Sequence, residues 1–137
     1  LHDASAGVVG VAHAGRPGLA AGVVPAVVQA MVHLGATPRD IDVSLGPSVC
    51  GACYEVPQAM QDEVSALVPA ARCRTRRGTP GLDLRAGARA QLAAAGVLRV
   101  DGRQNRCTVE DLSFFSHRRE GVTGRQAGVV WMRGRGA

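Results

Sequence analysis

The chemically most suggestive part of the sequence is His13 together with the glycines that follow it. Imidazole is a common metal ligand and carries protons near neutral pH. Gly15 and Gly18 bracket a tight turn before an apolar, helix-compatible segment, and the unbonded backbone N–H groups at a helix start can bind an anion. This order predicts a metal or phosphate centre, although it also suits a structural histidine at the end of a strand.

A second candidate is the pair Cys50 and Cys53, which has the C-x-x-C spacing of a redox dithiol or of half a zinc ribbon. A ribbon needs a second C-x-x-C pair, and the sequence has none. Cys107 and Cys73 are interpreted as a buried and an incidental thiol. Catalytic zinc needs three protein ligands, and His13 is the one convincing donor. We therefore expect no complete zinc site within these residues.

Arg118 and Arg119 form a third candidate, because paired guanidinium groups suit an oxyanion. They follow Phe114 and Phe115, which we expect to anchor the segment while one arginine is held toward the site. A surface pair on a loop is the alternative. A further arginine-rich stretch, residues 72–79, lacks apolar periodicity and is predicted to be an exposed loop, with a phosphate-contacting arm as the alternative.

Composition limits the class of protein. A chain of 137 residues with 46% hydrophobic residues is long enough for one globular domain with a real core. The net charge is +5, and all 16 basic residues are arginine, whose forked group suits phosphate. A compositional bias of the source explains the lack of lysine equally well. Aromatic residues make up only 3%, which disfavours a nucleic-acid surface built on stacked bases.

The remaining composition bears on location. The chain has four cysteines, no apparent signal peptide and no long apolar span, which predicts a reduced, cytoplasmic setting and no membrane role. Leu1 falls only a few residues before a core strand, so we also expect the chain to be truncated.

The elements around His13 follow from hydrophobic periodicity. An apolar run at residues 8–12 predicts a strand covered on both faces. Residues 19–34 have helical spacing, and Pro25 either lies in the first turn of the regular helix or kinks it. Residues 37–40 are predicted to form a single turn with Thr37 as its N-cap. A strand is then expected at residues 42–45.

The later segments continue this alternation of helix and strand. We predict a loop at 46–54, a helix at 57–68, a helix at 84–95 capped by Asp83, a strand at 97–100, a polar turn at 101–106, a helical turn at 109–112 and a last strand at 126–132. The alternation predicts a single α/β domain, a layered sandwich with a mixed β-sheet flanked by helices.

Three ordered motifs resemble a known family. HAGRPGLAAGVV, which begins at His13, resembles the HAGWRG-L-x-x-G-V-V signature of the YfiH-type family, the laccase-domain purine nucleoside phosphorylases. Residues 45–56, LGPSVCGACYEV, are similar to its G-P-x-I-x-x-x-C-Y-E-V. Cys107-Thr108 and residues 114–121, FFSHRREG, resemble its C-T and F-F-S-Y-R-R-D-G. The departures are Arg16-Pro17 for Trp-Arg, His117 for Tyr and Glu120 for Asp.

The resemblance runs over nearly the whole chain but covers only about the carboxy-terminal half of a usual member. It implies a YfiH-like fold and a purine nucleoside phosphorylase, in which phosphate attacks the ribose carbon of adenosine, inosine or guanosine as the purine leaves. Adenosine deamination is also attributed to the family, which has been labelled laccase and peptidoglycan editing factor as well. His13 matches the family's catalytic zinc histidine. The other two ligands, a histidine and the cysteine of an Asp-Cys motif, would lie before Leu1, so the chain alone is expected to be inactive.

The resemblance also implies roles for residues around that zinc. Arg16 would supply the charge of the missing Trp-Arg pair one position early, and Pro17 would remove a backbone donor. Substrate and phosphate contacts are expected from Gly15, Arg16, Gly18, Arg118 and Arg119, with Cys53 and Tyr54 in support.

Other functions remain open at this point. A laccase is disfavoured because a set of four coppers needs more histidine ligands than the four in this chain. The enzymatic alternative is a cysteine hydrolase that uses Cys53 and His13, and the alternative from another class is a basic module that binds RNA or a protein partner. A sheet that lacks upstream strands would expose an edge, which favours self-association.

Overall fold

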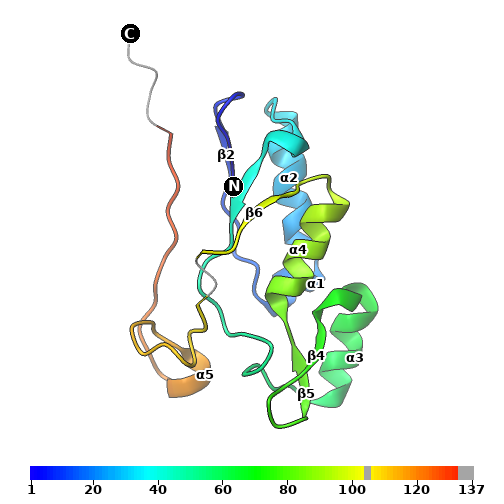
Figure 1. The fold of residues 1–137 in the computed structure, drawn as a ribbon, viewed down its shortest axis with the longest axis vertical. Helices are drawn as coiled ribbons and strands as arrows, with labels where there is room; N and C mark the ends of the chain where they lie inside the picture. Colours follow the sequence, from blue (N-terminus) through cyan, green and yellow to red (C-terminus); the bar gives the residue numbers. More distant parts are fainter. Residues whose placement is uncertain (104–105, 133–137) are drawn as a thin grey trace.

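The computed structural model describes residues 1–103 and 106–132 as a mixed α/β fold (Figure 1). Its elements are β1 (His2–Asp3), β2 (Val8–Val9), α1 (Arg16–Ala20), α2 (Val23–His33), the 3₁₀ turn η1 (Pro38–Asp40), β3 (Asp42–Ser44), α3 (Gln58–Leu67), the 3₁₀ turn η2 (Pro69–Ala71), β4 (Arg72–Arg74), β5 (Pro80–Leu82), α4 (Leu84–Ala94), β6 (Arg99–Asp101) and α5 (His117–Glu120). None of the described helices has the length and apolar character needed to cross a bilayer.

The main sheet is mixed, as predicted, with the strand order β2-β1-β3-β6. β1 runs antiparallel to β2 and β3, whereas β3 runs parallel to β6. The expectation that residues 8–12 form a strand covered on both faces is wrong. β2 lies at the edge of the described sheet and ends at Val9, and Val11 is 69% exposed. At Gly10 the backbone packs closely on α2, because a side-chain Cβ there would lie 2.8 Å from the Met31 sulfur.

The segment predicted as one helix at 19–34 forms two helices, α1 and α2. Gly22 separates them in the left-handed conformation with φ 80°, which glycine adopts without strain. Pro25 lies in the first turn of α2, as one of the two alternatives predicted. α1 and α2 both contact α4, and these helices lie along the sheet in Figure 1. Leu19 and Met31 are among the side chains that fill the core between them.

A hairpin replaces the exposed loop predicted at residues 72–79, because β4 pairs antiparallel with β5. The Gln61 side-chain amide, buried on α3, donates to the carbonyls of Cys73 and Gly81 at 2.7 Å each. Gly78 closes the turn with φ 77°. The side chain that bonds to both strands of this hairpin comes from α3, which precedes them in the sequence. The pattern of apolar residues within 72–79 therefore could not indicate the hairpin.

Two predicted caps have different outcomes. Asp83 caps α4 as predicted, since its carboxylate accepts the Ala86 N–H at 2.9 Å. Thr37 precedes η1 without a side-chain cap bond, and its backbone N–H instead donates to Asp3 Oδ2 at 3.0 Å. The strand predicted at 97–100 is shifted, because β6 spans residues 99–101 while Val97 is buried just before it.

The carboxy-terminal lobe, residues 106–132, departs most from expectation. The helical turn predicted at 109–112 appears as turns shifted toward Cys107, where the Asp111 N–H bonds to the Cys107 carbonyl at 2.9 Å. The short helix α5 was not predicted. The strand predicted at 126–132 is wrong: these residues run alongside the molecule in Figure 1 without pairing to any described strand. The predicted polar turn at 101–106 includes residues 104–105, which lie outside the described residues.

Candidate functional site

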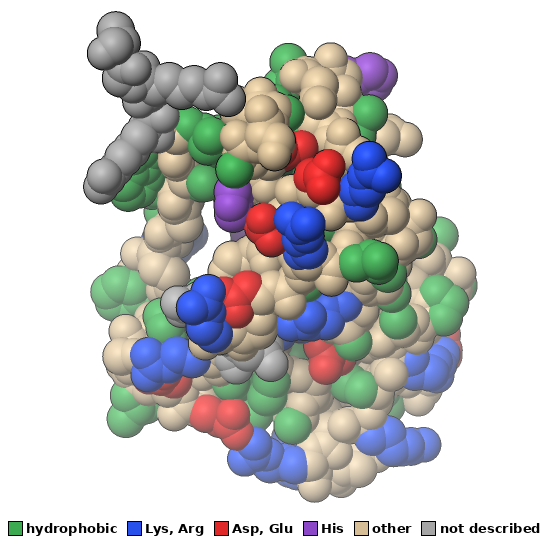
Figure 2. Space-filling model, turned by 45° about the horizontal axis from the view of Figure 1, so that its top comes forward, with side chains coloured by type: hydrophobic (Ala, Val, Ile, Leu, Met, Phe, Trp, Pro, Cys, Tyr) green, Lys and Arg blue, Asp and Glu red, His purple; other side chains and the backbone are tan. Residues whose placement is uncertain are grey.

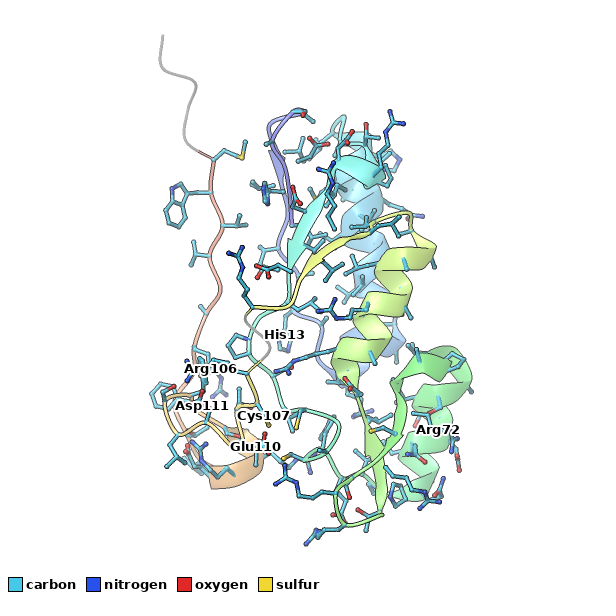
Figure 3. The ribbon with its side chains drawn as sticks, viewed as in Figure 1. His13, Arg72, Arg106, Cys107, Glu110 and Asp111 are labelled. Carbon is cyan, nitrogen blue, oxygen red and sulfur yellow. The ribbon has the colours of Figure 1, made fainter. Side chains whose placement is uncertain are left out.

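His13 lies on the loop between β2 and α1, with its side chain exposed (Figure 3). The two glycines after it make room for it. A Cβ at Gly15 would lie 2.9 Å from the imidazole Nε2, and a Cβ at Gly18 would lie 3.0 Å from the His13 carbonyl oxygen. The imidazole therefore sits against the start of α1, as the order of residues suggests. Its role as a metal ligand stays a prediction.

The start of α1 offers few backbone donors. The helix has five residues, Gly15 is its N-cap without a side-chain bond, and Pro17 has no N–H. The Leu19 N–H already bonds to the Gly15 carbonyl at 2.8 Å. Arg16 and Gly18 are left as the first-turn N–H donors. The phosphate role predicted for this turn thus rests on two amides and the Arg16 guanidinium, and it stays a prediction.

A group of potential metal ligands forms elsewhere, from Cys50, Cys53, Cys107 and Glu110. Their ligand atoms all lie within 4.8 Å of one another, and Figure 3 shows Cys107 and Glu110 on neighbouring turns of the lobe. Cys50 Sγ is 3.9 Å from Glu110 Oε2, and the Cys50 N–H points to Cys107 Sγ at 3.4 Å. The sequence has no second C-x-x-C pair, but the fold brings Cys107 and Glu110 to Cys50 and Cys53, so the expectation of no complete metal site has to be revised: this group could hold a metal ion.

Long-range backbone pairing brings these residues together across 57 positions of sequence. Ser48 pairs with Cys107 in a parallel bridge, in which the Thr108 N–H donates to the Ser48 carbonyl at 3.2 Å. Arg85, from α4, donates to Ser48 Oγ and to its carbonyl at 2.8 Å each, and also to the Arg106 carbonyl. The fold therefore positions the cluster from three segments of the chain.

One sequence signal could have found this group. Cys107 and Glu110 are separated by two residues, as Cys50 and Cys53 are. Two pairs of ligands, each closely spaced in the sequence, are typical of a four-coordinate zinc site. The signal was missed because the second pair combines a thiol with a carboxylate.

The loop that carries Cys50 and Cys53 packs tightly on the β4–β5 hairpin. A Cβ at Gly51 would lie 2.9 Å from both Cys73 Sγ and Asp83 Cβ. The Cys73 thiol donates to the Gly51 carbonyl at 3.5 Å. Cys73 is thus a packing residue of this loop, and the loop has little room to move.

The thiols of the cluster differ in acidity. Burial, followed by the hydrogen bond with Cys50, raises the pKa of Cys53 to about 12. Burial is also the largest effect on the pKa of Cys50, which is raised. Burial opposes ionisation of Cys107 too, but hydrogen bonds from the backbone N–H groups of Cys50 and Glu110 outweigh it and lower its pKa. Without a metal ion, Cys53 is a neutral thiol at pH 7.

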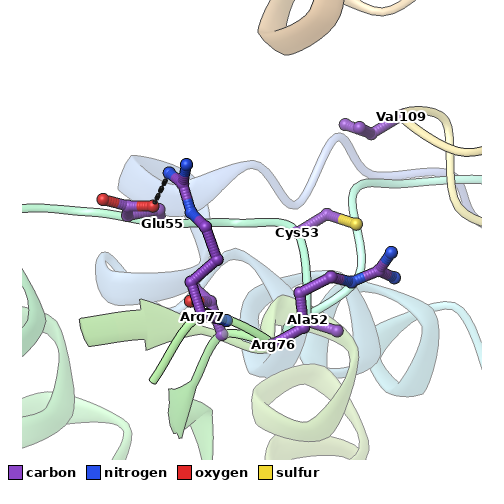
Figure 4. A pocket seen from close by; sticks show the side chains of 7 residues that line it. Ala52, Cys53, Glu55, Arg76, Arg77 and Val109 are labelled. Atoms are coloured by element: carbon purple, nitrogen blue, oxygen red, sulfur yellow. Dashed lines mark hydrogen bonds and ion pairs between the residues drawn. The ribbon is translucent and has the colours of Figure 1, made fainter. Parts of the chain in front are cut away.

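A pocket opens beside Cys53, and Figure 4 shows its lining. Arg76 pairs with Glu110, and Arg77 pairs with Glu55. The hydrogen bond from the Arg77 guanidinium holds the pKa of Glu55 below its usual value. Both arginines are therefore already balanced by carboxylates, and an anion entering the pocket would have to compete with them.

Arg118 and Arg119 have different surroundings. The Arg118 guanidinium lies over the Tyr54 ring, 4.7 Å from its centroid, and its side chain is exposed. Arg119 donates to the carbonyls of Thr108 and Phe114 at 2.8 Å each and pairs with Glu120. Arg119 thus holds the turns of the lobe together, and Arg118 is the more accessible of the two. Their contacts with substrate stay predictions.

Known proteins resemble this chain over almost its whole length. The family model described as multi-copper polyphenol oxidoreductase laccase matches residues 1–133. A Streptomyces griseus protein named purine nucleoside phosphorylase ORF3 is 54% identical over 133 residues, which are 96% of this chain and 53% of that protein. The chain spans about half the length of the curated relatives it matches.

Solved structures agree with this. The Bacillus licheniformis hypothetical protein YfiH is 31% identical, with a TM-score of 0.66 over 79% of this chain and 43% of that one. The Neisseria meningitidis protein NMB0706 is 36% identical, with a TM-score of 0.67 over 80% of this chain and 46% of that one. The three motifs, the mixed fold and these matches together place the chain in the YfiH-type family, whose model is described as multi-copper polyphenol oxidoreductase laccase.

Proposed function

We propose that this chain forms part of a purine nucleoside phosphorylase, which splits a purine nucleoside with phosphate into the free purine and ribose 1-phosphate. The observation that carries the proposal is the 54% identity to a Streptomyces griseus protein with that name. Because the chain spans about half of such relatives, the activity is proposed for a protein of their length. Adenosine, inosine and guanosine are the proposed substrates, with adenosine deamination as a side activity.

In this proposal His13 is one ligand of a catalytic zinc ion. Its imidazole packs against Gly15 at the start of α1 and is exposed. An exposed imidazole can bind a metal ion together with ligands from another segment of the chain. No group of potential metal ligands in the described residues includes His13, and the proposal places the remaining ligands in the further length that the curated relatives have. A bound zinc ion would supply Lewis acidity, while Arg16 and the Gly18 N–H would bind phosphate.

His13→Ala tests the metal role in a protein of the relatives' full length. Phosphate-dependent release of hypoxanthine from inosine and zinc at the catalytic site are expected to fall together, because a zinc site that loses one of three ligands is incomplete. His33→Ala is the matched control, since His33 is an exposed residue at the end of α2. Unchanged zinc content and turnover in His13→Ala would refute the assignment.

Arg16→Ala tests the phosphate role. Loss of a charge-assisted hydrogen bond costs about 1.5–3 kcal/mol, so the KM for phosphate is expected to rise roughly ten-fold or more while the KM for inosine changes little. Arg39→Ala serves as the control because the Arg39 side chain is 83% exposed and lies on η1. Equal phosphate KM values in the two variants would count against the role. The 137-residue chain by itself is expected to be inactive, since His13 is its one proposed ligand of the catalytic zinc.

The structure favours none of the alternative functions. A cysteine hydrolase of the predicted kind needs His13 beside Cys53 as its base, but the group of side chains gathered around Cys53 in the described residues contains Cys50, Cys107 and Glu110 and not His13. An RNA-binding surface needs unopposed positive charge, but Arg76, Arg77, Arg99 and Arg103 pair with carboxylates, and on the face drawn in Figure 2 arginines lie beside acidic side chains. A multicopper centre needs many histidines, and the metal-binding group in the described residues contains three cysteines and a glutamate.

A further inference from the structure

We propose that Cys50, Cys53, Cys107 and Glu110 bind a structural zinc ion, separate from the metal proposed at His13. Two ligands come from the loop at residues 46–54 and two from the carboxy-terminal lobe. The ion would fasten the lobe to the rest of the fold. The proposal depends on this cluster alone and holds whether or not the protein is a phosphorylase.

The geometry of the cluster is close to that of a zinc site. Zinc–sulfur bonds of about 2.3 Å in a tetrahedron place the ligand sulfurs roughly 3.8 Å apart. In the structure the four ligand atoms all lie within 4.8 Å of one another, so modest movements of the side chains bring them into range. The turn that joins Cys50 to Cys53 is already formed, with the Cys53 N–H bonded to the Cys50 carbonyl at 3.0 Å.

The kind of ligand selects the metal. Thiolates are soft donors that favour zinc, whereas calcium and magnesium prefer carboxylate, carbonyl and water oxygens. Three cysteines and a glutamate complete four-fold coordination and leave no position for a substrate or a water molecule. A closed site of this kind is structural rather than catalytic.

Three thiolates and a carboxylate carry more negative charge than one zinc ion neutralises, and a nearby arginine offsets part of the excess. The two oxygens of Glu110 face different partners: Oε2 is 3.9 Å from Cys50 Sγ, while Oε1 accepts a hydrogen bond from Arg76. One oxygen can therefore bind the ion while the other keeps its arginine. Such outer hydrogen bonds orient a ligand and offset its charge.

The cluster lies where the described residues bury few apolar side chains. Cys107 is buried, but Leu112, Val122 and Trp131 of the same lobe are largely exposed. The lobe therefore gains little from apolar burial. A metal bound by ligands from both segments would stabilise their contact directly.

The test is uptake of Co²⁺ and Zn²⁺ by the purified, reduced and metal-stripped protein. Co²⁺ is expected to produce the absorption of thiolate-to-metal charge transfer, and zinc should displace it. Cys107→Ser is expected to weaken this absorption by about a third, because it removes one of three thiolates. Cys73→Ser and His13→Ala are the controls, and both should keep the full absorption.

The proposal is overturned if no thiolate absorption forms, or if it disappears in His13→Ala and persists unchanged in Cys107→Ser. These outcomes concern metal binding alone, so they are independent of any phosphorolysis assay.

A second pair of variants covers the case in which Cys107→Ser does not fold. Glu110→Gln removes a ligand and an arginine pair, whereas Glu55→Gln removes only the comparable pair with Arg77. Glu110→Gln should lose most of the zinc-dependent rise in Tm, and Glu55→Gln should retain it. Arg76→Ala, which removes the outer partner of Glu110, should weaken zinc affinity about 10–100-fold. Equal zinc affinity in all three variants would show that Glu110 is not a ligand.

Discussion

The amino-terminal part of the molecule, residues 1–103, and the carboxy-terminal lobe are held by different forces. In the first part, Leu19, Ile41 and Leu82 are completely buried between helices and strands. In the lobe, Leu112 is 80% exposed and Val122 is 98% exposed. Within these residues the first part therefore depends on apolar burial, and the lobe has little of it.

Directional polar contacts hold the lobe. Within the lobe, Arg119 donates to the Thr108 carbonyl, and the Arg106 guanidinium lies 5.1 Å from the centroid of the Phe114 ring. Arg85 of α4, which lies outside the lobe, donates to the Arg106 carbonyl. Segments with few buried apolar contacts open locally at a lower free energy than the core does. We therefore expect the lobe to open locally while the core stays folded.

The largest expected effect is on the free energy of unfolding when the same substitution, leucine to alanine, is made in each of the two parts. Leu19→Ala should lower the free energy of unfolding by about 2–5 kcal/mol, because it leaves a cavity beside Gly87, whose added Cβ would lie 2.8 Å from Leu19 Cδ2. Leu112→Ala, at an exposed position, should change it by less than about 0.5 kcal/mol. Urea unfolding followed by circular dichroism measures both. Equal losses in the two variants would remove the basis of the comparison.

An intermediate effect is expected from Arg119→Gln. The substitution leaves the carbonyls of Thr108 and Phe114 without their charged donor, which should lower the free energy of local opening by about 1–3 kcal/mol. Hydrogen exchange should become faster for amides of residues 108–121 and stay unchanged in α2 and α4. Arg125→Gln is the control, because Arg125 is an exposed arginine of the same lobe. Faster exchange throughout the molecule would show that the lobe and the core unfold together.

The smallest effect concerns a polar contact inside the core. The backbone N–H groups of Ala6, Thr37 and Ser5 bond to the Asp3 carboxylate and lower its pKa. A lowered pKa in the folded state means that this stabilisation is present above the unfolded pKa, near pH 4, and is lost as the pH falls through the folded value. Tm measured from pH 6 downward should therefore fall less steeply in Asp3→Asn than in the wild type.

The control for this measurement is Glu63→Gln, since Glu63 is exposed on α3. Its Tm should follow the wild-type pH dependence. If Asp3→Asn also followed the wild type over the acid range, Asp3 would not be a pH-sensitive contact of the core.

Features encoded within a few neighbouring residues could be predicted from the sequence. The cap at Asp83, the helices α3 and α4 and the first-turn position of Pro25 depend on side-chain spacing and on backbone stereochemistry, which act locally. The close approach of His13 to Gly15 and Gly18 was likewise indicated by their order. The family could be recognised for the same reason, because its motifs are continuous stretches of sequence.

Contacts between distant segments could not be predicted in this way. The hairpin of β4 and β5 depends on a buried glutamine of α3. β2 lies at the edge of the sheet because β1 has β3 as its other neighbour, and this pairing joins separate segments of the chain. The strand predicted at residues 126–132 had suitable residues but has no described partner strand. Strand formation depends on pairing and packing as much as on propensity.

The sequence by itself determined the family, the α/β class and the order of most helices, because local propensity and motif spacing are properties of neighbouring residues. Only the tertiary structure decided that Cys50 and Cys53 meet Cys107 and Glu110. Their approach depends on the bridge between Ser48 and Cys107 and on Arg85, which join segments far apart in the chain. The distances between ligand atoms in such a cluster depend on how distant segments pack, and the spacing of residues within one segment does not determine them.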